Sequence, residues 1–274
     1  MATWVTHLMV ADQVLNTFTG LHRRGFCVGN IAPDCNVENE DWTAFTPSRE
    51  VTHWMQGSRK VAADCDLFYE EYIAKRAKEI TSDEQRAFLA GYYAHLIVDA
   101  AFQKMIREEN RVKAVWSRIK STPDLWLRAA GLPENWDTVK KLLPKNERQR
   151  EIFSLEAEYL QSHPDSGYLR EILPLTEFPD YIDYLPHGCI VRKIGVMGYI
   201  PQADMDTNKL ISISREEYSA FVTDATETVI AKFREKGLDF PDRGGYPGPT
   251  DMQTMMRKCY DTGTERILKI LYHQ

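Results

Sequence analysis

The segment from Thr81 to Ile106 constrains the fold most, because a single helical stripe within it carries both large apolar residues and ionisable ones. Thr81 and Glu84 have the spacing of a capping box, in which the hydroxyl and the carboxylate satisfy free amides of the first helical turn. Alternating steps of four and three residues then place six side chains on one face: Phe88, Tyr92, His95, Asp99, Phe102 and Ile106. The pattern predicts a long helix whose buried face holds a histidine and an aspartate one turn apart.

Helical periodicity also dominates the rest of the chain and predicts a mainly α fold. A loop with several Gly and Pro residues, over 25–47, interrupts this pattern. The further helices are expected over 6–18, 56–80, 146–161, 214–237 and 250–271, with short ones opened by Pro123 and Pro133. Ser214 and Glu217 have the spacing of a capping box at the start of the helix over 214–237. The only credible β structure is a small hairpin near 190–200, where apolar residues alternate weakly.

The chain of 274 residues shows no internal repeat and no shift in composition that would mark a domain boundary. We therefore expect one multi-helix domain over 1–274. Within it, residues 1–110 carry the motifs discussed below, and residues 111–274 add further helices and loops.

Charge and hydropathy exclude several classes of protein. The formal net charge is -6, and the basic residues are scattered, so no nucleic acid duplex is expected as a partner. No window approaches the roughly 20 apolar residues of a transmembrane helix, and the N-terminus lacks a signal peptide pattern. We therefore expect a cytoplasmic protein without a transmembrane segment. The five cysteines contain no CxxC pair and indicate neither a disulfide framework nor a cysteine zinc site.

His95 and Asp99 form the first chemical constellation. A spacing of four on a helix brings their side chains close enough to share one ion or to contact each other. A buried carboxylate needs compensation, which a metal ion, a His–Asp hydrogen bond or a nearby arginine could each provide. A less buried position for Asp99 would also remove the problem.

Asp34 and His53 extend this set. Asp34 follows Pro33 in the loop, where it could present a carboxylate or simply cap a turn. His53 lies beside Trp54 and could bind a metal or pack on aromatic surface. Two imidazoles and two carboxylates together suit zinc, and also iron or manganese.

Four segments resemble the zinc-dependent phospholipase C family, which includes the catalytic part of glycosylphosphatidylinositol phospholipase D and is related to the S1/P1 nucleases. The segments occur in the family's order over about the first 100 residues: Thr3–His7, Gly29–Asp34, Arg49–Trp54 and Gly91–Asp99. The resemblance implies a helical phospholipase C-like domain with zinc as cofactor. It also implies that Asp34, His53, His95 and Asp99 surround one ion, while His7 and the bridging Asp99 belong to a neighbouring one.

The sequence departs from the family's three-zinc site. Secreted members begin at a Trp whose amino group binds metal, whereas three residues precede Trp4 here. The family uses a further His later in the helix of His95, but none occurs before His163. One or two ions are therefore expected. Possible replacement ligands, each of which can equally be a solvated surface residue, are Glu108, Glu109, His163, Asp183 and His187.

The resemblance implies a metal-dependent hydrolase of phosphoesters, a phospholipase C-like phosphodiesterase that uses a metal-activated water. Asp34 is the candidate catalytic residue, which could orient or deprotonate that water. The expected substrate is a small phosphoester or a phospholipid head group; partner proteins cannot be inferred. Arg49 and Arg59 could steady phosphate, and Trp42 or Phe45 could touch a bilayer.

Two alternatives remain open at this stage. One is a cytosolic metallohydrolase acting on nucleotides or another small ester, although the adjacent His-Asp pair of HD-type phosphohydrolases is absent. The other is a non-enzymatic metalloprotein with a structural ion, which a closed site of four ligands would favour. The motifs of zincins, serine hydrolases, P-loop and dinucleotide-binding proteins are all missing.

Overall fold

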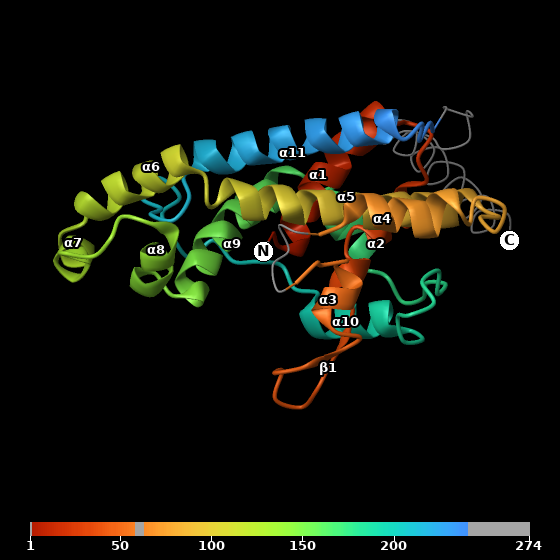
Figure 1. Ribbon diagram of the computed structural model, residues 1–274, viewed down its shortest axis with the longest axis horizontal. Coiled ribbons are helices and arrows are strands. Elements are labelled where there is room, and N and C mark those ends of the chain that lie inside the picture. Colours follow the sequence, from red (N-terminus) through yellow and green to blue (C-terminus); the bar gives the residue numbers. More distant parts are fainter. Residues whose placement is uncertain (1, 58–62, 241–274) are drawn as a thin grey trace, which may run out of the picture.

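The computed structural model of the protein describes residues 2–57 and 63–240, and over these residues the fold is mainly α-helical, as predicted (Figure 1). A long helix, α5 (Asp83–Met105), runs through the middle of the molecule, and α11 (Arg215–Glu235) lies along it. The predicted helix over 250–271 falls outside the described residues, as does Arg59. None of the described helices is long and apolar enough to cross a membrane.

The start of α5 shows how closely local sequence determined this helix. The cap is Ser82, one residue after the predicted Thr81, and its hydroxyl accepts a hydrogen bond from the Gln85 amide at 3.0 Å. The Gln85 side chain accepts in return from the Thr81 amide at 3.0 Å. A capping box needs the returning bond at the amide of the cap residue itself, so this pair is only half of one, and the box predicted at Thr81 and Glu84 is wrong. At α11 the predicted box, Ser214 with Glu217, is confirmed.

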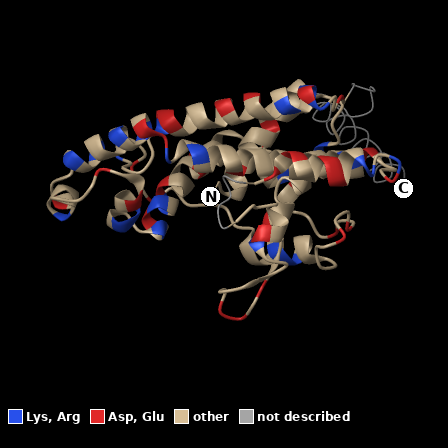
Figure 2. Cartoon of the chain, viewed as in Figure 1, with Lys and Arg blue, Asp and Glu red and all other residues tan. Residues whose placement is uncertain are grey.

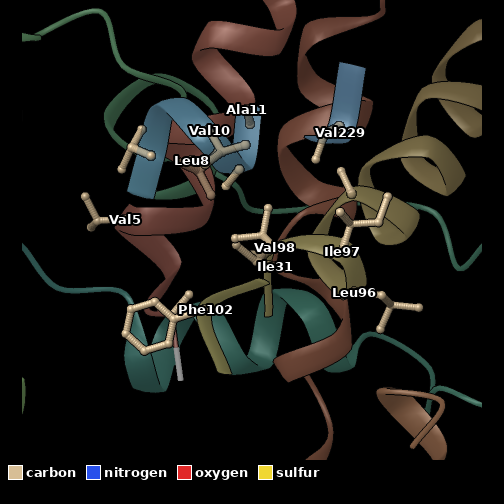
Figure 3. Close-up of a cluster of buried hydrophobic side chains, with 14 of the residues drawn as sticks. Val5, Leu8, Val10, Ala11, Ile31, Leu96, Ile97, Val98, Phe102 and Val229 are labelled. Atoms are coloured by element: carbon tan, nitrogen blue, oxygen red, sulfur yellow. The ribbon is translucent and has the colours of Figure 1, made fainter. Parts of the chain in front are cut away.

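Two helices near the N-terminus complete the core around α5. The first, α1 (Trp4–Thr17), packs on α11, and α2 (Arg23–Gly29) packs on α5. Figure 3 shows the apolar side chains where these helices meet, among them Leu8, Ile31 and Val98. Burying this apolar surface is the main force that holds the helices together.

Glycines allow α2 and α5 to approach backbone to backbone. A Cβ atom on Gly29 would lie 2.1 Å from the carbonyl oxygen of Phe88, and one on Gly91 would lie 2.3 Å from that of Phe26. Both obstacles are backbone atoms, which cannot rotate away. This close contact also sets the distance between Asn30, which follows α2, and His95, one turn after Gly91 on α5.

We expect Gly91→Ala to destabilise the protein by about 1–3 kcal/mol, the usual cost of overpacking, because the two helices must move apart. The measurement is urea unfolding followed by circular dichroism. The control is Gly195→Ala in α10 (Cys189–Met197), where an added Cβ meets no atom within 4 Å. That substitution should be neutral or stabilise by up to about 1 kcal/mol, since alanine favours helix more than glycine does. Equal effects at the two positions would contradict this account.

Figure 1 shows a group of further helices beyond the C-terminal end of α5. Those that extend from the C-terminal end of α5 are α6 (Glu109–Lys120), α7 (Pro123–Ala129), α8 (Trp136–Leu142) and α9 (Lys145–Ser162). The shorter elements are η1 (Ala32–Asp34), α3 (Arg49–Thr52), α4 (Cys65–Phe68), η3 (Tyr69–Ala74) and η4 (Tyr168–Ile172).

Three sequence-based expectations for secondary structure need correction. The hairpin near 190–200 is wrong, because Cys189–Met197 is the helix α10; Ile190, Lys193 and Ile194 are buried together, a helical rather than an alternating pattern. The antiparallel pair of the described chain is instead β1 (Val37–Glu38) with β2 (Phe45–Thr46).

The other two corrections concern element lengths. The helix expected over 56–80 is confined, within the described residues, to α4 and the π-helical turn η3 that follows it. The expected loop over 25–47 contains most of α2, the 3₁₀ turn η1 and the β pair. Tertiary contacts with α5 stabilise α2, which is too short to be stable on its own.

Candidate metal centre

Five side chains from four separate segments converge beside the middle of α5. His95 and Asp99 come from α5, His7 from α1, Asp34 from the end of η1, and His53 from the C-cap of α3. The three histidines and Asp99 are at most 1% exposed. The side chain of Asp34 is 13% exposed and is the most accessible of the five.

The five side chains form two overlapping groups that share His95. In one, ligand atoms of Asp34, His53 and His95 all lie within 4.8 Å of one another; in the other, the same holds for His7, His95 and Asp99. His53 Nε2 is 3.2 Å from Asp34 Oδ1 and 3.4 Å from His95 Nε2. The five ligands that the family resemblance implied are therefore brought together.

Hydrogen bonds at the outer ring nitrogens define how the two central histidines are oriented. His95 Nδ1 donates to the carbonyl oxygen of Asn30 at 2.7 Å, whereas His53 Nδ1 lies 2.9 Å from Thr52 Oγ1 and 3.2 Å from the carbonyl oxygen of Arg49. In a neutral ring the Nε2 of His95 is then unprotonated, and it lies 3.4 Å from His53 Nε2. Burial, together with the neighbouring His7, lowers the pKa of His95 well below its ordinary value and keeps this ring neutral. The unprotonated Nε2 of His95 is therefore available as a metal ligand.

His7 gives a second sign that the cluster is built to bind a ligand. Its ring stacks on that of His95, with centroids 3.8 Å apart. Both of its ring nitrogens are buried and have no hydrogen-bond partner among the described residues. Asp99 Oδ1 lies 3.7 Å from His7 Nε2, beyond hydrogen-bond distance, and accepts from the Ala2 amide at 3.3 Å. Since buried polar atoms are rarely left unsatisfied, the orphaned nitrogens fit a metal ion.

The structure also decides between the simpler explanations for His95 and Asp99. Asp99 is only 1% exposed, so its carboxylate is buried, as the helical stripe predicted. His95 Nε2 and Asp99 Oδ2 are 3.8 Å apart, which is too long for a hydrogen bond between them. A direct hydrogen bond from His95 therefore does not compensate this carboxylate.

A pocket with an empty volume of about 810 Å³, open solvent at its mouth included, opens beside Asp34. We name it the Asp34 pocket. Its polar lining includes Asp34, Arg49, Glu156 and Lys193. Its aromatic lining consists of Trp4, Trp42, Phe45, Phe153, Tyr168 and Tyr199. The candidate metal centre thus has an accessible side, because Asp34 belongs both to the ligand cluster and to the pocket lining.

Lys193 of α10 gives the wall of the Asp34 pocket a buried positive charge. Its side chain is 3% exposed and pairs with Glu38, which also accepts from Arg192 at 2.8 Å. The Lys193 Nζ lies 5.2 Å from the ring centroid of Trp42 and 5.5 Å from that of Phe45. The aromatic faces and one carboxylate hold the ammonium group in place.

Glu156 of α9 is a pocket residue that sequence reasoning missed. Its Oε1 accepts from the amide and the hydroxyl of Thr6 at 2.9 and 2.8 Å, whereas its Oε2 is buried and has no hydrogen-bond partner within the described part of the chain. Burial raises the pKa of this carboxyl to about 7, although the hydrogen bonds oppose the shift. One signal was available: Ile152, Glu156 and Leu160 are spaced by four, which aligns the carboxyl with buried apolar residues.

The possible replacement ligands do not join the cluster. All five are exposed, and neither group of three ligands includes them: Glu108, Glu109, His163, Asp183 and His187. Glu109, for example, forms a surface ion pair with Lys113 at 2.6 Å. Their alternative interpretation as solvated residues therefore agrees with the structure.

The fold and this cluster define a mainly helical protein with the donor set of a divalent-metal centre. Residues 6–102 match the family model described as zinc dependent phospholipase C. The resemblance inferred from the motifs is thereby confirmed: residues 6–102 are similar to the zinc-dependent phospholipase C family, which is all-helical, and the similarity supports a metal-dependent phosphoesterase in general. All five clustered side chains lie within the matched residues. No curated protein and no solved structure matches the chain significantly.

Proposed function

We propose that the protein is a metal-dependent phosphodiesterase that cleaves a phosphoester bearing an apolar group, of which a phospholipid is the leading example. His7, Asp34, His53, His95 and Asp99 would hold one or two ions. Nitrogen and oxygen donors of this kind suit zinc, with iron or manganese as alternatives.

The observation that carries the proposal is the position of Asp34. It belongs to the ligand cluster, 3.2 Å from His53 Nε2, and at the same time lines the Asp34 pocket. A purely structural ion would be enclosed by its ligands, whereas a catalytic one keeps an open side. The opening at Asp34 therefore favours catalysis.

The residues of the chain can be given roles on this basis. A bound divalent ion would lower the pKa of a water molecule and offset the negative charge of the phosphoester oxygens. Asp34 would accept the proton of the attacking water or orient it. Lys193 and Arg49, both in the pocket wall, would attract the anionic substrate into an acidic protein.

The surroundings of the Asp34 pocket support an apolar group on the substrate. Aromatic rings form much of its lining, and large apolar side chains are exposed close by in sequence. These are Trp42 at 45% exposure, Val196 at 49%, Met197 at 38%, Tyr199 at 48% and Ile200 at 58%. In Figure 1, α10 lies next to the β1 segment, so these residues belong to one region. Exposed apolar residues around a pocket mouth are typical of enzymes that act at a lipid surface.

The test is elemental analysis of the purified protein, combined with assays on a chromogenic phosphodiester, a nucleotide and phosphatidylcholine vesicles. We expect bound metal, hydrolysis of the phosphodiester and release of phosphocholine. Chelation should abolish turnover and lower the melting temperature, because an ion that binds only the folded state stabilises it. Hydrolysis of the nucleotide alone would favour the small-ester alternative. Bound metal without turnover of any substrate would overturn the proposal in favour of a structural ion.

A further inference from the structure

A second pocket, which we name the basic pocket, lies where the C-terminal end of α5 meets α6, α8 and the start of α9. It shares only Gln149 with the lining of the Asp34 pocket and has an empty volume of about 780 Å³, open solvent included. Five basic side chains line it, and no carboxylate does: Arg107, Arg111, Lys140, Lys145 and Arg148. Figure 2 shows basic segments on α8 and at the start of α9 in this region. Such a concentration of positive charge is unexpected in a protein whose net charge is -6.

Arg111 is the buried base of this pocket. It is only 7% exposed, and its terminal nitrogens donate to the backbone carbonyls of Ile106 and Ser212. Its Nε is buried and has no hydrogen-bond partner among the described residues. A guanidinium group held in this way is a preorganised donor with an unused N–H.

Trp136 links Arg111 to a second arginine. The guanidinium carbon of Arg111 is 5.0 Å from the Trp136 ring centroid, and that of Arg148 is 5.6 Å away. Arg148 also donates from Nε to the carbonyl oxygen of Leu143 at 2.9 Å. Both arginines are therefore fixed by neutral groups and keep their positive charge uncompensated at these contacts.

Carboxylates near the pocket neutralise little of this charge. Glu217 Oε2 is 3.9 Å from Arg111 Nε, but the same carboxylate forms a close pair with Arg118 at 2.9 Å. Lys140 pairs with Asp137 at 2.6 Å. Among the described residues, no ion pair is formed by the other three cations: Arg107, Lys145 and Arg148.

A buried acid and a helix end complete the electrostatic environment. Glu151 is 3% exposed, and its carboxylate accepts from the amides of Ile211 and Ser212 at 2.7 Å. Both of its oxygens are therefore hydrogen-bonded to backbone amides. The helix α9 begins at Lys145, and its N-cap, Pro144, makes no side-chain capping bond. The positive end of this helix dipole adds to the field at the pocket.

We propose that the basic pocket binds a phosphate-bearing anion at a site separate from the candidate metal centre. Arginine forks and lysines are the residues that proteins use to bind phosphate, and a multivalent anion would offset the repulsion among the five cations. A free sugar bisphosphate and an anionic lipid head group share this chemistry. The site does not depend on the proposed hydrolase activity, since none of its charged residues belongs to the ligand cluster.

The experiment compares the wild type with Arg107→Gln/Lys145→Gln and with a control, Lys113→Gln/Lys141→Gln. Both variants lose two charges from exposed positions, but the control residues do not line the pocket. Titration calorimetry with fructose 1,6-bisphosphate at constant ionic strength tests a free anion. Flotation with phosphatidylcholine vesicles, with and without phosphatidic acid, tests a lipid head group. Metal content and melting temperature are measured in the same samples.

We expect the pocket variant to bind the bisphosphate or the phosphatidic acid vesicles at least about tenfold more weakly, and the control to stay within about twofold of the wild type. The probe that responds identifies the source of the phosphate group. Equal weakening in the two variants would show only a general charge effect and overturn the proposal. Binding that is unchanged in the pocket variant, or absent in the wild type with both probes, would overturn it as well.

Discussion

His95→Ala should bind divalent metal at least about 100-fold more weakly than the wild type. Even the loss of a residue that only hydrogen-bonds a metal ligand typically lowers metal affinity by about 10–100-fold, and His95 is a candidate ligand itself. His95 belongs to both groups of candidate ligands, so its loss affects each of them. Phosphodiester hydrolysis is expected to fall with the metal content. Asp99→Asn should weaken metal binding in the same direction while keeping the shape of the side chain. The measurement is elemental analysis after dialysis against a weak chelator.

Matched substitutions at the surface separate metal binding from general damage. His187→Ala removes an imidazole whose side chain is 98% exposed, and Asp137→Asn removes a carboxylate that is 80% exposed. Both controls should retain metal and activity. Circular dichroism must show that His95→Ala is folded, and Asp99→Asn serves as the second variant if it is not. Normal metal content in both Asp99→Asn and a folded His95→Ala would refute the proposed centre.

Asp34→Asn should reduce the rate of phosphodiester hydrolysis by about 10²–10⁴-fold, the usual contribution of a positioned general base. The amide keeps an oxygen that can bind metal but cannot accept the proton of the attacking water. We therefore expect this variant to retain more metal than His95→Ala at the same loss of activity. Its kcat, KM and metal content need to be measured on one preparation.

Asp41→Asn is the control for Asp34→Asn, because Asp41 is an exposed aspartate between β1 and β2. It should have wild-type activity. If Asp34→Asn loses metal and activity in proportion, Asp34 acts as a ligand and the role of base belongs elsewhere. If it keeps both, Asp34 has neither role, and the opening to the pocket would no longer argue for catalysis.

The helices that the sequence predicted well are those whose own residues specify them. In α5 the caps and the apolar stripe that define the helix all lie within one segment. The prediction differed from the structure only at the N-cap, which is Ser82 instead of Thr81. The capping box at Ser214 is also specified by residues within one segment. The same holds for the helix predicted over 146–161, which corresponds to α9 (Lys145–Ser162). Short elements were predicted poorly, as at α2 and α10, because packing against neighbours decides their conformation.

The candidate site was predictable for a related reason. His95 and Asp99 lie one turn apart on a predicted apolar face, and the family motifs added His7, Asp34 and His53, all within the residues that the family model matches. Glu156 was missed although its helix was predicted, because a single glutamate on an otherwise mixed helix gives a weak signal. The basic pocket was also missed, since its cations come from the α5–α6 connection, α6, α8 and α9 and are scattered along the chain.

The sequence by itself determined the helical class, the stripe that buries His95 and Asp99, and the identity of the candidate ligands, because these follow from periodicity and from motifs within short segments. Only the tertiary structure decided which side chains meet. The glycine contact of α2 with α5 sets the distance between Asn30 and His95, and folding of α9 and α10 onto the N-terminal half places Glu156 and Lys193 around Asp34. Contacts between distant segments depend on how whole helices pack, which no local pattern encodes.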